Sequence, residues 1–347
     1  MVSTPPSRNI VAQLNDFGLD NISIVQRPLL TLEPSEIRVR VGAASLNHRD
    51  LMVVCGKVPE PPKLPLVLLS DCAGEVVEIG RNVTRLKVGD RVVPTTLPTW
   101  VSGPFIPGVL ATGLGCGANG VLSKYFDGDQ RGFVLIPEGL SLEEAATLPC
   151  AALTAWNALF EQGNLKPGQT VLVQGSGGVS TFALQFALAS GARVIATTGS
   201  ASKVGRLLEL GASHVINYRR YPEWSEQVLE FTGGAGVDYL VETGGAGTLD
   251  QSIKAAAVGG SISVIGMLTG AYGTFDTMPI LRKTLRLQGI VAGSVEMFER
   301  MNCTIETLGI HPVIDRVFEM REVVEALKYL ASGQHIGKIV EQAKHQL

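Results

Sequence analysis

Apolar and polar residues alternate along short stretches in the first part of the chain. In EIRVRVGA, residues 36–43, Ile37, Val39 and Val41 are separated by polar or small residues, the period of a strand with one buried face. Similar stretches, punctuated by Gly, Pro and Asn, occur at residues 74–79, 90–93, 120–125 and 133–136. The chain up to about residue 136 is therefore predicted to be mostly antiparallel β.

From about residue 140 the apolar residues take a helical spacing. Ser141, followed by Glu144 three residues later, predicts a capped helix start in SLEEAATLPCAALTAWNALFEQG. Beyond this helix, continuous apolar runs alternate with helical segments, at residues 170–174, 193–197, 214–217, 238–242 and 261–266. Such alternation predicts a parallel, doubly wound sheet. After about residue 292 the alternation fades, so the C-terminal segment is expected to return to the first domain.

A glycine-rich turn joins the first of these runs to the next helix, in TVLVQGSGGVS at residues 170–180. Glycine lets a pyrophosphate approach the backbone amides at a helix N-terminus, where a side chain would block it. Ser180 replaces the third glycine of the usual motif and is small enough for close packing. The strand–turn–helix context predicts a dinucleotide site rather than an ordinary tight turn, formed by Gly175, Ser176, Gly177, Gly178, Val179 and Ser180.

The end of the second strand bears on which dinucleotide binds. Sites that prefer NAD place Asp or Glu there, to hold the ribose hydroxyls. Residues 197–200 read TTGS, without an acid, and Ser202, Lys203 and Arg206 follow. Hydroxyls and positive charge suit the extra phosphate of NADP(H), which we predict as the cofactor, bound in part by Thr198, Ser200 and Lys203. The alternative is that Lys203 and Arg206 are solvated helix residues.

Composition narrows the classes of function. The length of 347 residues favours two domains, and 45% hydrophobic with 18% charged residues indicates a globular protein. The net charge of -3 is dispersed, so nucleic-acid binding is not expected, and neither a signal peptide nor a membrane span is apparent. The five cysteines include no C-x-x-C pair and are expected to be reduced. These features predict a cytoplasmic enzyme that acts on small molecules.

Six motifs extend over nearly the whole chain: VGAASLNHRDL at 41–51, LPLVLLSDCAGEVVEIG at 64–80, VGDRV at 88–92, EEAATLPCAALTAWNAL at 143–159, QGSGGVS at 174–180 and LGASHVINY at 210–218. With them the sequence resembles the medium-chain dehydrogenase/reductase superfamily, in its zinc-free quinone oxidoreductase and alcohol dehydrogenase-like branch. The resemblance implies an α/β fold: a GroES-like, mostly antiparallel β catalytic domain, residues 1–150 completed by 293–347, and an inserted Rossmann NADPH-binding domain, residues 151–292.

The same resemblance implies a site without metal. Zinc-dependent relatives carry a catalytic Cys at the position of Asn47, a His at that of Ser70 and often a Cys at that of Cys150, and only the last is present. A catalytic zinc needs three protein ligands. The structural zinc of such relatives needs four closely spaced cysteines, whereas this region has only Cys116. No metal is therefore predicted.

In similar proteins the segment 47–50 lines the cleft beside the nicotinamide, which makes Asn47, His48 and Asp50 the catalytic candidates. Asn47 and His48 would orient the substrate and supply a proton, because hydrogen-bond donors must polarise the acceptor where zinc is absent. The alternative for His48 is a loop histidine held by Asp50. Some zinc-free relatives have a donor tyrosine where this chain has Met52, and Tyr125 is either a substitute or a core residue.

The resemblance extends the cofactor site to the loops after the later strands. It implies nicotinamide contacts from Thr154, Gly266, Met267, Ala292 and Ser294, and adenosine contacts from Thr243 and Gly244. Each could instead be an ordinary turn residue. A homodimer is also implied, with residues 286–293 as a candidate edge strand.

Three functions remain open from the sequence. The first is NADPH-driven reduction of a small electrophile, namely a quinone, an activated alkene or a carbonyl compound. The second is metal-free alcohol oxidation. The third is an NADPH-binding regulatory protein with little catalysis.

Overall fold

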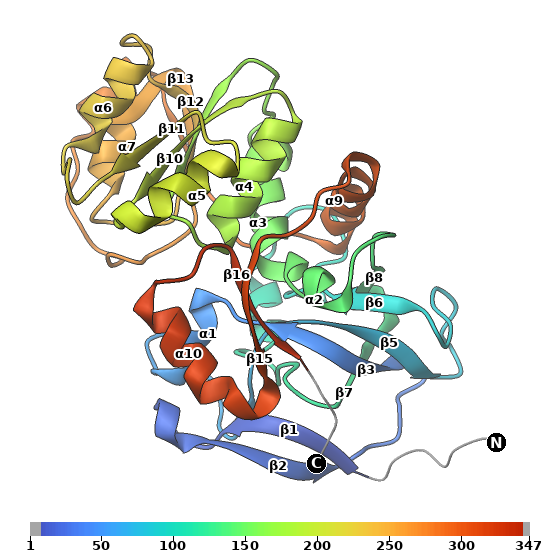
Figure 1. Ribbon diagram of the computed structural model, residues 1–347. Coiled ribbons are helices and arrows are strands. Elements are labelled where there is room, and N and C mark those ends of the chain that lie inside the picture. Colours follow the sequence, from blue (N-terminus) through green and yellow to red (C-terminus); the bar gives the residue numbers. More distant parts are fainter. Residues whose placement is uncertain (1–7, 343–347) are drawn as a thin grey trace. The chain divides into compact units, whose positions relative to one another are not determined.

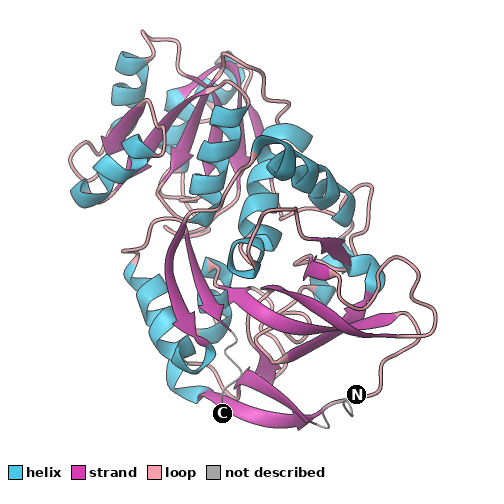
Figure 2. Cartoon of the chain, turned by 45° about the vertical axis from the view of Figure 1, so that its right-hand side comes forward, coloured by secondary structure: helices cyan, strands magenta, loops and turns pink. Residues whose placement is uncertain are grey.

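The computed structural model describes residues 8–342, and most of the N-terminal stretch assessed for a signal peptide lies outside this range. The chain forms two compact units. The first comprises the residues up to Leu153 together with those from Gly293 onward, and the second comprises Thr154–Ala292. The first unit is rich in strands and loops, whereas helices flank the sheet of the second (Figure 2). Within the described range, no helix has the length and apolar character needed to cross a membrane.

The first unit contains two sheets. A seven-stranded sheet has the order β15-β16-β3-β5-β6-β8, with β7 paired to β3, and a smaller sheet has the order β2-β1-β4. All pairs are antiparallel except β15 with β16. The strands are β1 (Arg8–Leu14), β2 (Ile22–Pro28), β3 (Glu36–Ser45), β4 (Leu66–Val67), β5 (Asp71–Ile79), β6 (Arg91–Pro94), β7 (Tyr125–Asp129), β8 (Phe133–Leu135), β15 (Ile314–Glu319) and β16 (Lys338–Gln342).

The predicted strand at residues 120–125 is wrong, because the regular strand β7 begins only at Tyr125. The backbone N–H groups of Val121 and Leu122 donate to the carbonyls of Leu69 and Leu68 instead of a regular ladder. This path requires Gly120, since a Cβ atom there would overlap the Leu69 carbonyl. The local pattern resembles a strand, but tertiary contacts decide its conformation.

Four α-helices belong wholly to the first unit: α1 (His48–Val54), α2 (Leu142–Ala145), α9 (Val295–Leu308) and α10 (Val323–Ser332). The predicted cap of α2 is confirmed, because Ser141 Oγ accepts from the Glu144 amide at 3.1 Å and the Glu144 carboxylate accepts from the Ser141 amide at 2.8 Å. The long helix expected there is interrupted. π-helical turns at 148–152 and 157–161 flank the short α3 (Leu153–Trp156), and Pro149 lacks the N–H that a regular helix needs.

The second unit is a six-stranded parallel sheet of order β11-β10-β9-β12-β13-β14. Helices α4 and α5 lie on one face and α6 and α7 on the other (Figure 1). Its elements are β9 (Thr170–Gln174), α4 (Gly178–Ala189), β10 (Arg193–Thr198), α5 (Val204–Glu209), β11 (His214–Asn217), α6 (Trp224–Phe231), β12 (Val237–Glu242), α7 (Leu249–Ala255), β13 (Ala256–Val264), α8 (Met278–Arg282) and β14 (Arg286–Gly289). The strand order reverses between β9 and β12, and ligands bind outside the carboxyl ends of strands at such a point.

The C-terminal segment shares the hydrophobic core of the first unit. Leu327 of α10 and Ile339 of β16 belong to the same buried cluster as Leu46, Leu68 and Val121. Strand β16 also pairs with β3 through Val340 and Ser45. Strands β15 and β16 therefore complete the sheet from which the chain enters the 47–50 segment.

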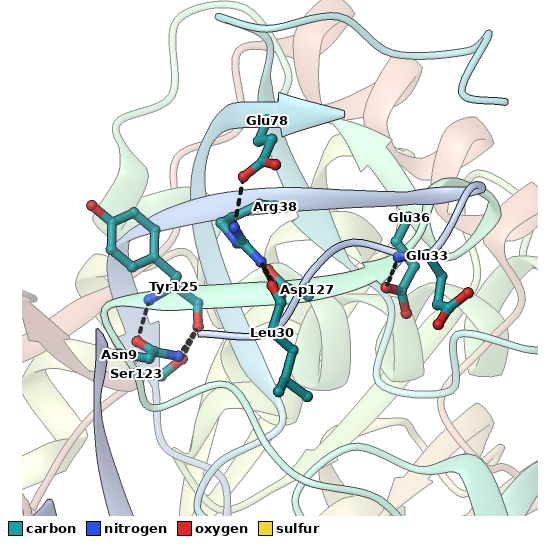
Figure 3. A network of polar contacts seen from close by, with 9 residues as sticks. All are labelled: Asn9, Leu30, Glu33, Glu36, Arg38, Glu78, Ser123, Tyr125 and Asp127. Carbon is teal, nitrogen blue, oxygen red and sulfur yellow. Dashed lines mark hydrogen bonds and ion pairs between the residues drawn. The ribbon is translucent and has the colours of Figure 1, made fainter. Parts of the chain in front are cut away.

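A buried ion-pair network ties β3 to two neighbouring strands. The side chain of Arg38 is 5% exposed, and its guanidinium lies 2.8 Å from both carboxylate oxygens of Asp127 and 2.6 Å from Glu78 (Figure 3). It also donates to the Leu30 carbonyl. Removal of this cation would leave a partly buried carboxylate without its partner.

We expect Arg38→Met to lower the free energy of unfolding by about 2 kcal/mol, less than for a fully buried pair because Glu78 is 43% exposed. Arg40→Met is the matched control in the same strand, since both members of the Arg40–Glu75 pair are exposed, and it should cost less than about 1 kcal/mol. Urea denaturation measures both values. Equal losses of unfolding free energy in the two variants would contradict a stabilising role of the buried Arg38 network.

Candidate functional site

The glycine turn after β9 presents backbone donors at the start of a twelve-residue helix. Gly175 has φ 77°, in the region that favours glycine. Gly177 is the N-cap of α4, and no described side chain caps the helix. The first-turn N–H groups are therefore available to an anion. Ser180 is buried, and its hydroxyl donates to the Gln174 carbonyl at 2.5 Å, so this serine ties α4 to β9 where a glycine is usual.

A buried polar network, which sequence reasoning missed, joins the ends of β9 and β12. Gln174 Nε2 donates to the Glu242 carboxylate at 2.7 Å, while Gln174 Oε1 accepts from the amides of Thr243 and Gly244. Glu242 Oε1 also accepts from the Gly244 amide at 2.8 Å and the Thr248 hydroxyl at 2.6 Å. The network fixes the loop after β12 against the glycine turn. The signal was a polar residue ending each of the two strands that meet where the order reverses.

A second polar group gathers after β10. Lys203 Nζ lies 3.0 Å from Ser176 Oγ of the glycine turn, and the hydroxyls of Ser200 and Ser202 are 2.8 Å apart. Thr198 is buried at the strand end. Arg206, by contrast, pairs with Glu209 at 3.1 Å. The structure thus brings Lys203 to the glycine turn, places the two serine hydroxyls beside each other, and pairs Arg206 with Glu209.

Tyr218 is another residue that sequence reasoning missed. A Cβ atom on Gly199 would lie 2.4 Å from the Tyr218 hydroxyl, so the phenol lies directly against the backbone after β10. Tyr218 follows β11, the neighbour of β10 in the sheet, and is 42% exposed. Its position after the adjacent strand was the available signal. Tyr218 adds an aromatic face and a hydroxyl to the polar group after β10.

The remaining cofactor candidates are more scattered. Gly266 closely approaches the Thr243 backbone, and both Gly266 and the exposed Met267 line a cavity of about 220 Å³. Thr154 is buried, and the carbonyl of Ala292 accepts from Asn157 Nδ2 at 2.8 Å. Ser294 lies in the other unit, where its hydroxyl accepts from the Met297 amide as the cap of α9. That hydroxyl is engaged in a helix cap, as an ordinary structural serine would be.

The catalytic candidates lie in the first unit, at the start of α1. Asn47 is the N-cap of α1, and its amide N–H donates to Asp50 Oδ2 at 2.7 Å. The Asn47 side chain meets the ammonium of Lys338, which is 2.6 Å from Asn47 Oδ1 and 2.6 Å from the Leu46 carbonyl. Lys338 is 3% exposed, and burial lowers its pKa, an effect that Asp71, Cys150 and Asp50 oppose.

Asp71 organises the neighbouring part of this cluster. Its carboxylate accepts from the Ser70 hydroxyl at 2.6 Å, the Thr96 hydroxyl at 3.3 Å and the Cys150 amide at 3.0 Å. Desolvation, assisted by the charge of Asp71, raises the pKa of the Cys150 thiol to about 12. Cys150 is therefore a thiol rather than a thiolate at neutral pH.

Two buried carboxyl groups complete the cluster. Desolvation raises the pKa of Asp50 to about 6, and its Oδ1 lies 3.9 Å from Arg49, beyond hydrogen-bond distance. Glu341 is 1% exposed, and burial raises its pKa well above the usual range. Neither Asp50 Oδ1 nor either Glu341 oxygen has a hydrogen-bond partner within residues 8–342.

His48 is exposed at the first position of α1, although desolvation lowers the pKa of its ring. Asp50 bonds the Asn47 amide rather than His48, so the alternative of a histidine held by Asp50 has no support in the described contacts. Tyr125 is partly buried in β7, and its backbone exchanges two hydrogen bonds with the Asn9 side chain (Figure 3). Among the catalytic candidates, Asn47 is therefore the one whose backbone and side chain are both held by described contacts.

Comparison with known proteins identifies the family. Residues 33–138 match the alcohol dehydrogenase GroES-like domain, and residues 178–307 match the zinc-binding dehydrogenase domain. A zinc-type alcohol dehydrogenase-like protein of Schizosaccharomyces pombe is 43% identical over 89% of this chain and 91% of its own length. The chain belongs to the medium-chain dehydrogenase/reductase superfamily.

Two further similar proteins carry the names of different activities. A quinone oxidoreductase-like protein 2 homolog of Nematostella vectensis is 30% identical over 90% of this chain and 83% of its own. A solved NAD-dependent alcohol dehydrogenase is 32% identical, with a TM-score of 0.88 over 96% of this chain and 99% of that one. The antiparallel unit and the parallel six-stranded unit match the superfamily's α/β architecture, and the chain is an oxidoreductase of this superfamily.

Because some superfamily members bind zinc, we tested whether this site could do so. Among the described residues, no three His, Cys, Asp or Glu side chains are grouped as metal ligands. The Lys338 ammonium lies 2.6 Å from Asn47 Oδ1, and a fixed positive charge opposes a bound cation. Cys150 by itself cannot hold a catalytic zinc ion, which needs three protein ligands. The residues present do not fit a catalytic zinc ion.

Proposed function

We propose that this protein is a zinc-independent, NADPH-dependent reductase that transfers hydride to a quinone, an activated alkene or a carbonyl compound. The observation that carries the proposal is the polar group after β10, where Lys203 lies 3.0 Å from Ser176 and no acid stands at the strand end. A cation and hydroxyls at that place favour a phosphate over free ribose hydroxyls.

The cofactor would be held at the carboxyl ends of β9, β10 and β12. The pyrophosphate would bind the uncapped amides at the start of α4, and the adenosine phosphate would bind Ser200, Lys203 and Tyr218. Bound NADPH would supply the hydride, as is usual for nicotinamide cofactors. The other predicted contacts, among them Thr154, Gly266 and Ala292, remain part of this proposal.

The protein's own part in the reaction would be to polarise the acceptor. Lys338 donates a hydrogen bond to the side-chain oxygen of Asn47, and the N–H₂ group of the same amide remains as a donor. A hydrogen bond from this group to an acceptor oxygen would stabilise the charge that develops there as hydride adds. Asp50 would hold the Asn47 backbone, and His48 or water would supply the proton.

The names of the relatives support reduction of a quinone in one case and a different activity in another. The Nematostella protein is named quinone oxidoreductase-like, whereas the solved structure at 32% identity is named an NAD-dependent alcohol dehydrogenase. Metal-free alcohol oxidation is therefore the second candidate function, and it would appear as alcohol-dependent formation of NADPH. A regulatory protein that binds NADPH without turnover is the third.

We further propose a cytoplasmic homodimer. Strand β14 pairs only with β13 among the described strands, so its other edge is open to a second copy. All five cysteines are free, in keeping with a reducing compartment. Sedimentation at several concentrations tests the dimer.

Oxidation of NADPH by the purified protein, with NADH as the paired cofactor, tests the function against quinones, enones, aldehydes and ketones. The proposal predicts turnover of one class of acceptor with NADPH. Turnover only of alcohols with NADP⁺ would favour the second candidate function, and binding of NADPH without any turnover would favour the third.

Lys203→Ala should raise the Kd for NADPH about 10-fold and leave the Kd for NADH nearly unchanged, since only NADPH carries the extra phosphate. Arg206→Ala is the matched control, because Arg206 pairs with Glu209. Fluorescence titration measures all four constants. Equal weakening of NADH and NADPH by Lys203→Ala would contradict a role in choosing between them.

A further inference from the structure

The sheet register of the first unit brings Lys338 opposite Asn47, although 291 residues separate them. Strand β16 pairs with β3 through Val340 and Ser45, and the Leu46 amide donates to the Ile339 carbonyl at 3.0 Å. One step further along, Lys338 reaches the Leu46 carbonyl and Asn47 Oδ1. The contact is therefore dictated by antiparallel pairing rather than by a mobile side chain on the surface.

This contact fixes which end of the Asn47 amide faces Lys338. An ammonium group has three donors and no acceptor, so the atom that meets it must be the amide oxygen. The N–H₂ group, Nδ2, then points away from Lys338. Asn47 is only 9% exposed, and Nδ2 has no hydrogen-bond partner among the described residues. A buried donor without a partner is unfavourable in a resting protein, which suggests that a ligand completes it.

We propose that Lys338 is a positioning residue that holds the Asn47 amide with its N–H₂ group directed to the substrate's oxygen. This inference rests on the proposed function and adds how the donor is aimed. Without Lys338 the amide could rotate by 180° about its last bond and present its oxygen to the substrate, where it would repel the developing negative charge. The substrate class that such a donor serves has an oxygen that gains charge when hydride adds, namely a carbonyl, an enone or a quinone.

The burial of the ammonium supports a specific role for Lys338. The charges of Asp50 and Asp71, both no more than 1% exposed, oppose the effect of burial on the pKa of Lys338. Buried lysines are rare unless they are paired. A methionine could fill the same space in the core without that network, so a purely packing role would not require a lysine.

The test is a double-mutant cycle in the full-length protein, with kcat, KM and the Kd for NADPH measured for each variant. Lys338→Met and Asn47→Ala should each lower kcat about 10-fold to 100-fold, with the Kd for NADPH within about 3-fold of wild type. The double variant should be no more than about 2-fold worse than Asn47→Ala, because both changes remove one unit. Lys328→Met, an exposed lysine of α10, is the control and should match wild type.

Asn47→Asp separates positioning from structure. It keeps an oxygen acceptor for Lys338, now in a carboxylate, but has no N–H₂ group, so it should lose kcat as Asn47→Ala does while unfolding at a temperature no lower than wild type. Retained activity in Asn47→Asp, or losses that multiply in the double variant, would overturn the proposal.

A neutron crystal structure of Lys338→Met, which distinguishes the amide nitrogen from the oxygen, provides a readout that does not depend on turnover. The Asn47 amide should lose its single orientation in that variant. An unchanged orientation would overturn the inference even if no acceptor is found for the wild-type protein, whereas absence of turnover in the wild type alone would reject the proposed function.

Discussion

Gly177→Asp should abolish dinucleotide binding while leaving the fold intact or slightly more stable. Gly177 is the N-cap of α4, with φ -77° and ψ -177°, an extended conformation that Asp readily adopts. Asp is among the best N-cap residues, because its carboxylate accepts from the first-turn amides. The same carboxylate would occupy the donors proposed for the pyrophosphate and repel its charge. We expect the Kd for NADPH to rise at least about 100-fold, close to 3 kcal/mol.

Gly177→Asn is the matched control, since it has the same shape without the charge and should weaken binding less. Fluorescence titration gives the Kd values, and thermal unfolding shows whether the fold survives. Tight NADPH binding by Gly177→Asp would mean that the cofactor phosphates do not use the start of α4.

The pH dependence of stability should change in Asp50→Asn. Burial raises the pKa of Asp50 to about 6, above its ordinary value of 3.8, so the folded protein binds this proton more tightly than the unfolded chain does. Stability from this group is present below the unfolded pKa and is lost as the pH rises through about 6. The difference between the folded and unfolded pKa values of Asp50 corresponds to about 3 kcal/mol.

The free energy of unfolding of wild type minus that of Asp50→Asn should therefore fall by about 2 kcal/mol between pH 4 and pH 7, the part of the full effect that lies in this range. Part of this difference comes from Glu341, because the charge of Asp50 adds to burial in raising the pKa of Glu341 and acts in the same direction. Asparagine can still accept from the Asn47 amide, so the cap of α1 remains. A difference that does not vary with pH would show that Asp50 is ionised in the folded state as readily as in the unfolded chain.

The sequence pattern predicts the parallel sheet well, because its strands are buried, apolar and separated by regular helices. The start of β13 was missed, since residues 256–260 read AAVGG and glycine is rare in strands. Residues 120–125, GVLSKY, were predicted to be a strand, but β7 begins only at Tyr125 and the backbone of Val121 pairs with that of Leu69. Local pattern cannot reveal which partner a backbone chooses.

The candidate site could be predicted only where its residues lie close together in sequence. The glycine turn and the 47–50 segment carry their own motifs. Lys338 has none, because its role depends on a register between β16 and β3 that joins opposite ends of the chain. Tyr218 likewise becomes a candidate only when β10 and β11 are known to be neighbours.

Isotope transfer tests most directly whether this protein transfers hydride from NADPH without zinc. The protein would be incubated with NADPH that carries deuterium at both positions of the reactive carbon, an accepted enone or carbonyl substrate and a zinc chelator, and the product analysed by mass spectrometry. The account predicts one deuterium in the product and a rate that the chelator does not change. A product without deuterium, or activity that the chelator abolishes and added zinc restores, would contradict it.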